Sequence, residues 1–328
     1  MTWLRRGLIA LGVLVLVPVL AAAGTVAWLA AEGEGTVPAA RGSGHDAMWL
    51  GHAWVDGRRT QADVDDLANR VRTAGIRDLY VHSGPLASDG TLDPALRPRA
   101  KWFVGAVHQA VPGVRVQAWL GTIVGPLDPA DPVARGRLVA SAGQVLDDGF
   151  DGVHYDLEPM PNGTPGYVAL LAATHDLTRA RHAVLSLATH QIEPLPGLHV
   201  PFGWVLGKAH FWSTDYLAEI ARNVDQVAIM AYDSGMPFET AYTGYIREQT
   251  RLALEAVPES VTVLIGIPAY HTDEPGHTSA ETVAASLRGV RLAVGDQPPR
   301  RPFGVAYYVD FDATPADWTA YLDGWAQR

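Results

Sequence analysis

The sequence predicts an α/β fold, a (β/α)8 TIM barrel preceded by an N-terminal transmembrane or signal segment. Short β-type apolar runs alternate with helix-type patterns eight times along the chain, and such alternation indicates parallel strands joined by helices. Residues 47–328 also suit a single barrel, which needs roughly 250 residues. An open doubly wound sheet is the alternative. No Gly-x-Gly-x-x-Gly or Walker-type loop follows the first strand, which weakens that alternative.

Residues 1–31 form a separate unit in this prediction. Arg5 and Arg6 precede an uncharged run over residues 7–31. This run exceeds the apolar core of a signal peptide, about 7–15 residues, and matches the roughly 20 residues that span a bilayer. We expect an uncleaved signal anchor, with a signal peptide cleaved near Ala21–Ala23 as the alternative. Arginines before the span place the remainder outside the cytoplasm, so we expect a single-pass cell-membrane protein or a secreted one.

Residues 32–46 are rich in Gly, Ala, Pro and Ser and lack periodicity, which is typical of a flexible linker. The barrel domain follows over residues 47–328. Its expected strands are residues 48–55, 76–82, 114–122, 152–158, 183–190, 227–232, 261–270 and 304–309. Helix starts are predicted at capping patterns and at prolines in a first turn, namely Thr60–Asp63, Asp131–Pro132, Thr164–Pro165, Thr278–Glu281 and Thr314–Asp317.

The composition excludes several classes of chemistry. The chain has no cysteine, so catalytic thiols, disulfides and thiolate metal sites are excluded. Its formal net charge of −10 argues against nucleic acid or an anionic polysaccharide as the main partner, because both would be repelled at long range.

The fourth expected strand carries the most informative pattern, Phe-Asp-Gly-Val-His-Tyr-Asp-Leu-Glu over residues 150–158. Because side chains alternate across a strand, His154, Asp156 and Glu158 project from one face. Carboxylates are costly inside a sheet unless they are paired or put to use, so this pair at a strand end predicts an acid–base site facing a cavity. A solvated pair or a structural salt bridge is the alternative reading of the spacing alone.

Polar and aromatic residues also stand at the ends of other expected strands, on the face where barrels of this type carry their active sites. The further site candidates are Trp119, His190, Tyr232, Asp233, Tyr270 and Tyr308. Aromatic rings pack on the C–H faces of sugars, while carboxylates accept hydrogen bonds from their hydroxyls. The pattern therefore favours a neutral carbohydrate as the partner.

On these residues the chain resembles the family 18 glycoside hydrolases, the chitinase-like barrels. Residues 151–158, Asp-Gly-Val-His-Tyr-Asp-Leu-Glu, are similar to the family's Asp-x-x-Asp-x-Asp-x-Glu strand. The family's Met-x-Tyr-Asp is present at Met230–Asp233, and its Gly-x-Pro-x-Tyr at Gly266–Tyr270. The resemblance covers most of residues 47–328 at the level of strand order, and it implies a TIM barrel with a glycosidase site.

The resemblance implies a hydrolase of an N-acetylated glycan, chitin-like or peptidoglycan-like, that uses no cofactor. Glu158 would be the general acid, and the substrate's own 2-acetamido group the nucleophile, with retention at the anomeric carbon. Asp156 would orient the acetamido nitrogen and raise the pKa of Glu158, while Tyr232 would hydrogen-bond the acetamido oxygen. Asp233 would help to bind the distorted sugar, and Met230 belongs to the same motif.

Two positions depart from the family pattern. His154 replaces the first Asp of the inner carboxylate pair, and we expect it to hydrogen-bond Asp156 from below. Tyr308 replaces the tryptophan that commonly floors the sugar subsite. These changes leave the level of activity and the preference for N-acetylglucosamine open.

Two other functions stay open. A chitinase-like protein that binds sugar with weak or no catalysis is favoured by the two substitutions, whereas the retained Glu158 argues against it. A metal-dependent TIM-barrel hydrolase would use His154, Asp156, Glu158 and His190 as ligands. No HxH or HExxH clustering supports that second alternative.

Overall fold

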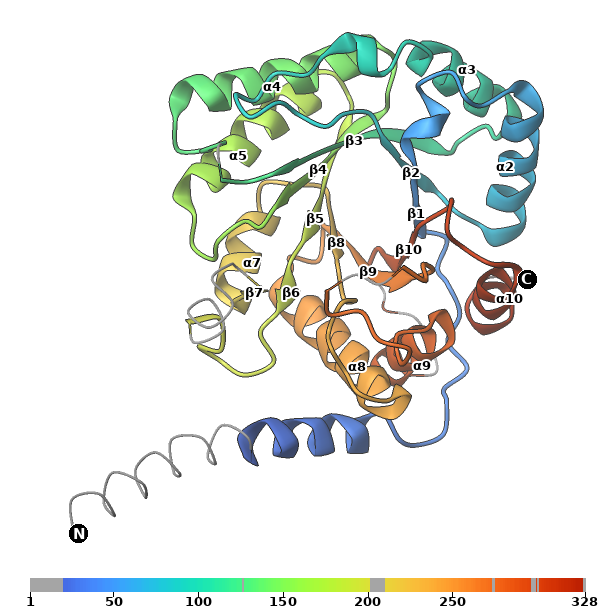
Figure 1. Ribbon diagram of the computed structural model, residues 1–328, viewed down its shortest axis with the longest axis vertical. Coiled ribbons are helices and arrows are strands. Elements are labelled where there is room, and N and C mark those ends of the chain that lie inside the picture. The colour runs from blue at the N-terminus through green and yellow to red at the C-terminus, as the bar shows by residue number, and fades with distance from the viewer. Residues whose placement is uncertain are drawn as a thin grey trace, which may run out of the picture.

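The structure, a computed structural model, describes residues 20–125, 127–200, 210–272, 275–295, 299 and 301–326. Eight parallel strands close into a barrel in the order β1-β10-β9-β8-β5-β4-β3-β2, and helices surround it (Figure 1). Every neighbouring pair in this order is parallel, as the connecting helices require. The predicted (β/α)8 barrel is therefore confirmed.

Each barrel strand overlaps the strand expected at its place. The strands are β1 (Ala47–Leu50), β2 (Asp78–His82), β3 (Arg115–Ile123), β4 (Gly152–Glu158), β5 (Val184–Thr189), β8 (Gln226–Ile229), β9 (Thr262–Pro268) and β10 (Phe303–Tyr308). The first is shorter than expected, because the chain turns at Gly51 into a short 3-10 helix, η1 (His52–Trp54). The Trp54 indole then donates to Asp310 at 2.7 Å.

The helices begin mostly where the capping patterns predict. They are α2 (Gln61–Ala74), α3 (Ala100–Ala110), α4 (Pro132–Asp147), α5 (Pro165–Ala180), α7 (Thr214–Ala221), α8 (Glu239–Ala256), α9 (Val283–Val294) and α10 (Pro315–Gly324). Capping boxes form at Thr60 and at Thr314, each with an Asp three residues on. The box predicted at Thr278–Glu281 is wrong. Helix α9 begins later, and its cap is Thr282, whose hydroxyl accepts from the backbone N–H of residue 285.

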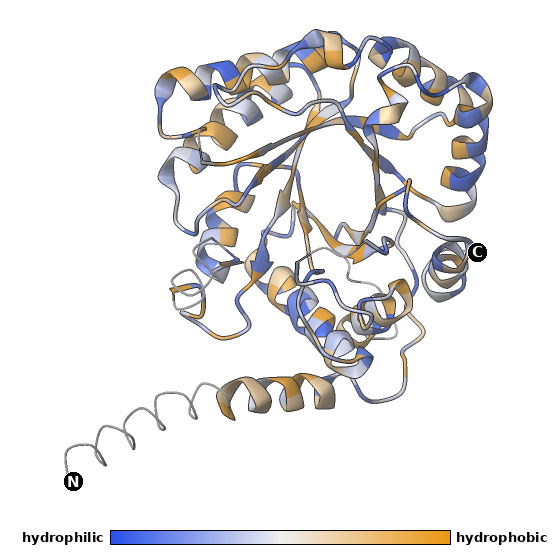
Figure 2. Cartoon of the chain, in the orientation of Figure 1, coloured by the Kyte–Doolittle hydropathy of each residue, from blue (hydrophilic) through white to orange (hydrophobic). Residues whose placement is uncertain are grey.

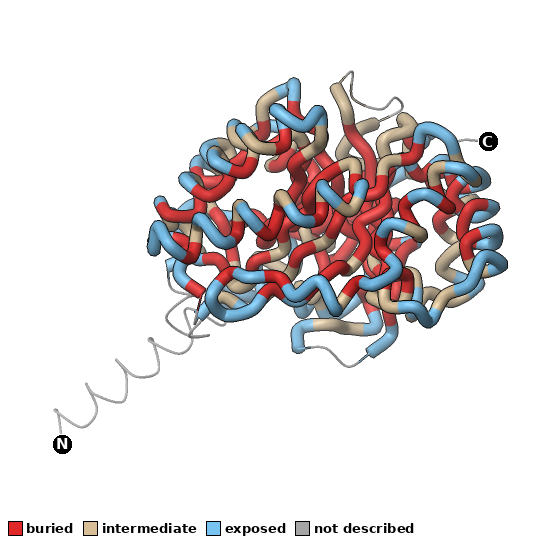
Figure 3. Tube along the Cα trace, turned by 90° about the horizontal axis from the view of Figure 1, so that it is seen from above, coloured by how far each residue is buried: buried red, intermediate tan, exposed pale blue. Residues whose placement is uncertain are grey.

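Two apolar cores stabilise the barrel. The larger one lies between strands and helices and includes outward-facing strand residues such as Val153, Leu185 and Val227. The smaller one fills the interior and comprises Ala47, Trp49, Tyr80, Ala188, Ala228, Leu264, Ala306 and Val309. Viewed from above, the buried chain concentrates in the strands, and exposed segments lie on the helices and loops (Figure 3). The interior is thus a packed core with a site above it.

Residues 20–32 form a helix outside the barrel, near α8 (Figure 1). The two lie very close: a Cβ at Gly244 would come within 1.8 Å of the Leu29 carbonyl oxygen, so only glycine fits there. Figure 2 shows this helix in the colours of apolar residues. Among the described residues, no helix is both long and apolar enough for a membrane span. Residues 1–19 of the predicted anchor lie outside the described residues, so the anchor stays a prediction.

Residues 33–46, where a flexible linker was expected, contain no helix or strand and run along the barrel. Arg288 donates to the Gly35 carbonyl at 2.8 Å, and Arg291 donates to that of Pro38 at 2.7 Å. At its end the buried Asp46 carboxylate accepts from the Val305 N–H at 2.8 Å. These contacts hold the segment against the barrel, and composition alone did not predict them.

The chain between β5 and α7 forms a small second sheet beside the barrel. Strands β6 (Gln191–Ile192) and β7 (Phe211–Trp212) pair in parallel. Trp212 is buried, and its indole donates to the Met160 carbonyl at 2.8 Å. This aromatic residue therefore supports the chain that follows β4.

Candidate active site

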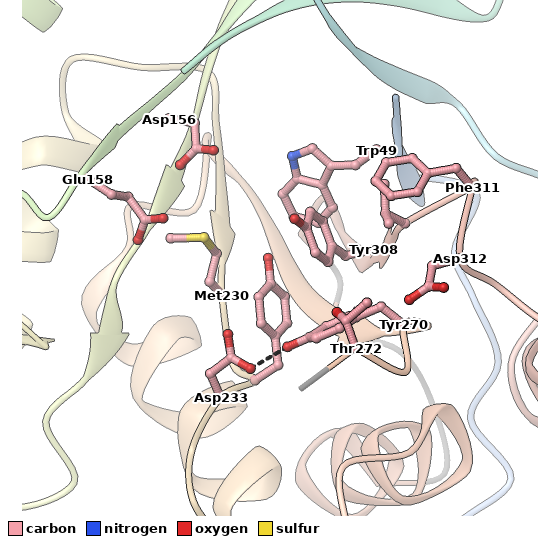
Figure 4. Close-up of a pocket in the computed structure, with 12 residues that line it drawn as sticks. Trp49, Asp156, Glu158, Met230, Asp233, Tyr270, Thr272, Tyr308, Phe311 and Asp312 are labelled. Atoms are coloured by element: carbon pink, nitrogen blue, oxygen red, sulfur yellow. Dashed lines mark hydrogen bonds between the residues drawn. The ribbon is translucent and has the colours of Figure 1, made fainter. Parts of the chain in front are cut away.

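Two cavities lie above the packed interior and share two carboxylates, Glu158 and Asp233. The first, of about 380 Å³, is lined by Trp49, Asp156, Glu158, Met230, Tyr232, Asp233, Tyr270, Thr272, Tyr308, Val309, Phe311 and Asp312 (Figure 4). The second, of about 480 Å³, is lined by Ile123, Glu158, Pro159, His190, Gln191, His210, Met230, Tyr232, Asp233 and Pro275. Both cavities share Glu158, Met230, Tyr232 and Asp233. A ligand that fills both must therefore pass Glu158.

Glu158 ends β4 and is accessible. Its side chain is 45% exposed, and in Figure 4 the carboxylate points into the first cavity. His190 lies behind it, with Nδ1 at 3.7 Å from Glu158 Oε1. The other nitrogen, Nε2, accepts from the Met160 N–H at 2.9 Å. A nitrogen that accepts carries no proton, so the neutral ring carries its proton on Nδ1, the atom that faces Glu158.

Asp156 lies two residues before Glu158 on the same face of β4, deeper in the barrel. Its Oδ2 accepts from the Trp119 indole at 2.8 Å, while its Oδ1 is buried without a hydrogen-bond partner. Burial raises the pKa of this carboxyl to about 6, and the hydrogen bond from Trp119 only partly opposes the shift. A buried acceptor without a donor is rare. Here it faces a cavity, so a ligand can supply the donor.

His154 lies below Asp156, and the expected contact between them is wrong. The imidazole is fully buried, and its Nε2 accepts from the Trp49 indole at 3.0 Å. Its Nδ1 lies 2.8 Å from Ser186 Oγ, and the ring stacks on Tyr80 with centroids 3.8 Å apart. Both ring nitrogens are thus used in the core. Burial also lowers the pKa of His154 well below 6.5, so the ring is neutral.

Aromatic rings form the wall opposite the carboxylates. Tyr308 stacks on Tyr232 with centroids 5.1 Å apart and an interplanar angle of 16°. Trp49 and Tyr270 each meet Tyr308 edge-on, at 5.5 and 5.4 Å. Gly266 makes this packing possible, since a Cβ there would come within 3.0 Å of the Tyr232 ring. The wall offers both ring faces and phenol groups to a ligand.

Asp233 lies at the boundary of the two cavities in an unusual backbone conformation. Its φ of 55° is in the left-handed region, which non-glycine residues seldom adopt. The Tyr270 hydroxyl donates to its carboxylate (Figure 4). Its own backbone N–H donates to Glu281 at 2.6 Å. Tyr270 thus holds the side chain of Asp233, and Glu281 holds its backbone.

The structure brings together most of the predicted site. Seven predicted residues line the first cavity: Asp156, Glu158, Met230, Tyr232, Asp233, Tyr270 and Tyr308. His190 lines the second. Trp119 and His154 are not among the described residues that line either cavity. Trp119 instead donates to Asp156, and His154 lies in the core.

Several lining residues were not predicted. Trp49 is the second residue of the expected strand over residues 48–55, far from its predicted end, whereas β1 ends at Leu50 and brings Trp49 to the cavity. Phe311 and Asp312 lie in the loop after β10, and His210 lies just before β7. These loop residues show no periodicity, so no sequence signal placed them at the cavities.

The described residues contain one group with the geometry of metal ligands. Asp233, His277 and Glu281 each offer an atom within 4.8 Å of the others. The four ligands expected for a metal-dependent hydrolase do not form such a group in the described part of the chain, since His154 spends both nitrogens in the core. That alternative therefore loses its proposed site.

The charge of the lining is one-sided. The first cavity contains four carboxylates, Asp156, Glu158, Asp233 and Asp312, and the second contains two histidines. Among the described residues that line either cavity there is no lysine or arginine. An anionic ligand would meet repulsion here, whereas a neutral one with several hydroxyl or amide donors fits.

Sequence comparisons find no match, either among protein-family models or among curated proteins. Comparison of folds does find similar structures. The spore cortex-lytic enzyme SleL of Bacillus megaterium QM B1551 is similar with a TM-score of 0.60 and 13% identity, over 89% of this chain and 75% of that one. The C-terminal domain of a putative chitinase from Desulfitobacterium hafniense DCB-2 also gives 0.60 and 13%, over 88% of this chain and 98% of that one.

A third similar structure is the family 18 chitinase ChiB of Flavobacterium johnsoniae, with a TM-score of 0.54 and 14% identity over 88% of this chain and 94% of that one. At such low identity, the likeness concerns the arrangement of the chain. It agrees with the motif resemblance found in the sequence. The protein thus has the same barrel fold as these chitinases and the cortex-lytic enzyme, at 13–14% sequence identity.

Proposed function

We propose that the protein is a glycosidase that cleaves an N-acetylated glycan, with Glu158 as the general acid. One observation carries this proposal: Glu158 is a partly exposed carboxylate at the junction of two cavities. A general acid in a glycosidase must reach the oxygen between two sugars, so it needs a sugar on each side. The three similar structures reported above are named as a cortex-lytic enzyme, a putative chitinase and a chitinase, which supports the same class of substrate.

The proposed reaction has two steps. Glu158 gives its proton to the glycosidic oxygen, the C1–O bond breaks, and the sugar in one cavity departs as an alcohol. The carbonyl oxygen of the 2-acetamido group bonds to C1 and forms a cyclic oxazolinium ion. Glu158, now ionised, takes a proton from water, which attacks C1 and opens the ring. The product retains its anomeric configuration because C1 is inverted twice.

Asp156 and Tyr232 would serve the acetamido group in this scheme. The unpartnered Oδ1 of Asp156 can accept from the acetamido N–H and stabilise the positive charge of the intermediate. Tyr232 lines both cavities and can donate to the acetamido oxygen. Asp233 would bind a sugar hydroxyl at the boundary, and Tyr308 with Trp49 would pack against the ring.

A protein that binds the glycan without cleaving it is the competing function. The comparison that separates the two is Glu158→Gln against wild type, with Glu248→Gln as a matched control. Glu248 is a buried glutamate on α8 that pairs with Arg251 at 2.6 Å, away from the described lining residues. Turnover of labelled N-acetyl oligosaccharides should fall by about 1,000-fold or more in E158Q alone, while oligosaccharide binding persists. A wild type that binds but shows no turnover would establish the binding function instead.

The stereochemistry of the product tests the second step. Proton NMR of the fresh hydrolysis product should show the anomer with the configuration of the substrate. An inverted product would exclude the acetamido group as the nucleophile.

We further propose that residues 1–31 export the protein and anchor it in the cell membrane, or are cleaved on secretion. The arginines followed by an uncharged run support this. Fractionation of cells that express the full chain tests it. An anchored protein should stay with the membranes after a high-salt wash, whereas recovery in the cytoplasmic fraction would contradict the proposal.

A further inference from the structure

We propose that Glu281 is a positioning residue that fixes Asp233 at the junction of the two cavities. This inference rests on the proposed function, since Asp233 is expected to bind the sugar there. Glu281 itself is not among the described residues that line the two cavities. It would act through the backbone of the loop between β8 and α8.

The Glu281 carboxylate accepts hydrogen bonds from two consecutive backbone N–H groups of that loop. Its Oε2 accepts from the Asp233 N–H at 2.6 Å, and its Oε1 accepts from the Ser234 N–H at 2.8 Å. The Ser234 hydroxyl adds a third hydrogen bond at 2.8 Å. A carboxylate is well suited to this task, because each of its two oxygens accepts and neither donates.

Burying Glu281 and straining the Asp233 backbone both cost free energy of folding, which argues that the arrangement serves a function. The Glu281 side chain is fully buried, and burial raises its pKa. It also holds Asp233 at a φ of 55°, a conformation that costs a non-glycine residue roughly 1 kcal/mol or more. Strained backbone of this kind persists only where its surroundings enforce it. Here the enforcing group is Glu281.

The loop after β9 closes around the same point. The Gly235 N–H donates to the Gly276 carbonyl at 2.8 Å, and a Cβ at Gly276 would lie 2.6 Å from the Asp233 carbonyl oxygen. The Nδ1 atom of His277 lies 3.5 Å from Glu281 Oε2 and 3.7 Å from Asp233 Oδ1. The two carboxylates and this histidine therefore join the β8 and β9 loops at the mouth of the barrel.

The consequence is a defined direction for the Asp233 side chain. With the backbone fixed by Glu281, the carboxylate meets the Tyr270 hydroxyl and stays on the lining of both cavities. Release of the backbone would let Asp233 relax toward an ordinary φ, and its carboxylate would leave the junction. Glu281 thus decides whether Asp233 can reach the sugar.

Kinetics of Glu281→Gln test this role. Glutamine keeps one acceptor oxygen but turns an NH2 group toward a backbone N–H, so kcat/KM should fall roughly 10- to 100-fold, as expected for a misplaced binding group. Glu248→Gln should be unchanged. Ser234→Ala removes only the hydroxyl contact and should lose less than about 3-fold.

A double-mutant cycle separates positioning from general damage. If Glu281 acts through Asp233, then Glu281→Gln in the Asp233→Asn background should lower kcat/KM by less than about 3-fold. The same full loss in both backgrounds would overturn the proposal. Should the Gln variant prove insoluble, Glu281→Asp serves instead, since its shorter side chain withdraws the carboxylate from both backbone groups.

A ligand-free measurement keeps this test independent of the proposed function. The crystal structure of the Gln variant should show Asp233 outside the left-handed region and without its hydrogen bond from Tyr270. An unchanged Asp233 would refute the positioning role even in an active enzyme. Stoichiometric metal in the purified wild type, with activity abolished by EDTA, would also overturn it, because Glu281 would then be a metal ligand.

Discussion

His154 and Asp156 lie two residues apart on β4 and face the same barrel interior, yet their surroundings differ completely. Around His154 the polar groups satisfy one another: Ser186 donates to Gln117 at 2.7 Å, and Gln117 donates to Gln226 and to Asp78 at 2.9 and 2.8 Å. Asp156, one layer higher, keeps a buried oxygen without a partner. In the lower layer the polar groups around His154 satisfy one another's hydrogen bonds. In the upper layer the free oxygen of Asp156 needs a donor from a ligand.

This difference indicates which layer serves stability and which serves function. Buried polar groups that are fully paired rigidify a core, whereas unpaired ones lower stability and persist mainly at functional sites. The lower layer should therefore lose stability when changed and the upper layer activity. The following variants, from the largest expected effect to the smallest, can break or sharpen that division.

Asp156→Asn should have the largest effect, a fall in kcat of about 100- to 1,000-fold, or roughly 2.7–4 kcal/mol in the activation barrier. Asparagine still offers an oxygen to the Trp119 indole but removes the negative charge that faces the intermediate. Steady-state kinetics on an N-acetyl oligosaccharide measures it. Asp147→Asn, at an exposed aspartate paired with Arg181, is the control. Equal turnover in the two variants would place Asp156 among the structural residues.

His154→Leu should destabilise the protein by about 2–3 kcal/mol, because the Trp49 indole N–H is left buried without an acceptor. Urea denaturation measures the free energy of unfolding. The direction in which this destabilisation changes with pH also follows from the pKa of His154. The pKa of His154 is lowered in the folded state, so its contribution to stability is present above pH 6.5 and is lost as the pH falls below it. The destabilisation by leucine should therefore shrink at pH 5, and a growing one would contradict the neutral ring.

Asp156→Asn should at the same time stabilise the protein at pH 8 by about 1–2 kcal/mol. The pKa of Asp156 rises from 3.8 to about 6 on folding, so wild type loses stability as the pH rises from about 4 to 6. The full shift corresponds to roughly 3 kcal/mol at 1.4 kcal/mol per pH unit, and we expect less because Asp156 lines the first cavity and is not enclosed in the apolar core. The gain should vanish near pH 3.5. If the variant were less stable than wild type at pH 8, the ionised Asp156 carboxylate of wild type would already be stabilised by its surroundings.

The smallest expected effect is no effect at all. Between pH 7.5 and 5.5, the ¹⁵N shifts of the His154 ring should stay those of a neutral imidazole with its proton on Nδ1, because Nε2 accepts from Trp49. A histidine in an unstructured reference peptide, whose pKa is about 6.5, serves as the control. A shift of His154 toward the imidazolium values would undo the contrast between the two layers.

Local patterns predicted much of this protein. The capping box at Thr60, the Asp131–Pro132 start of α4 and the alternation over β4 are properties of neighbouring residues, and the structure confirms all three. The box at Thr278–Glu281 failed because a carboxylate can serve any nearby donor. Glu281 found two in a loop some fifty residues away, which no local pattern encodes.

The site divides in the same way. Asp156, Glu158 and Tyr232 were predicted because strand periodicity and the motifs place them at strand ends. The position of Trp49 beside Tyr308 depends on how β1 closes against β10. The polar and aromatic groups around His154 come from five other strands, β1, β2, β3, β5 and β8. Sequence spacing does not report which residues of distant strands share a layer.

The sequence by itself determined the order of strands and helices, the face of β4 that turns inward and the presence of two carboxylates there, because all of these follow from period and local propensity. Only the tertiary structure decided that His154 is paired and neutral while Asp156 is left with an unpaired oxygen. Barrel closure sets which strands meet at each height, and hydrogen bonding in a closed interior depends on those meetings alone.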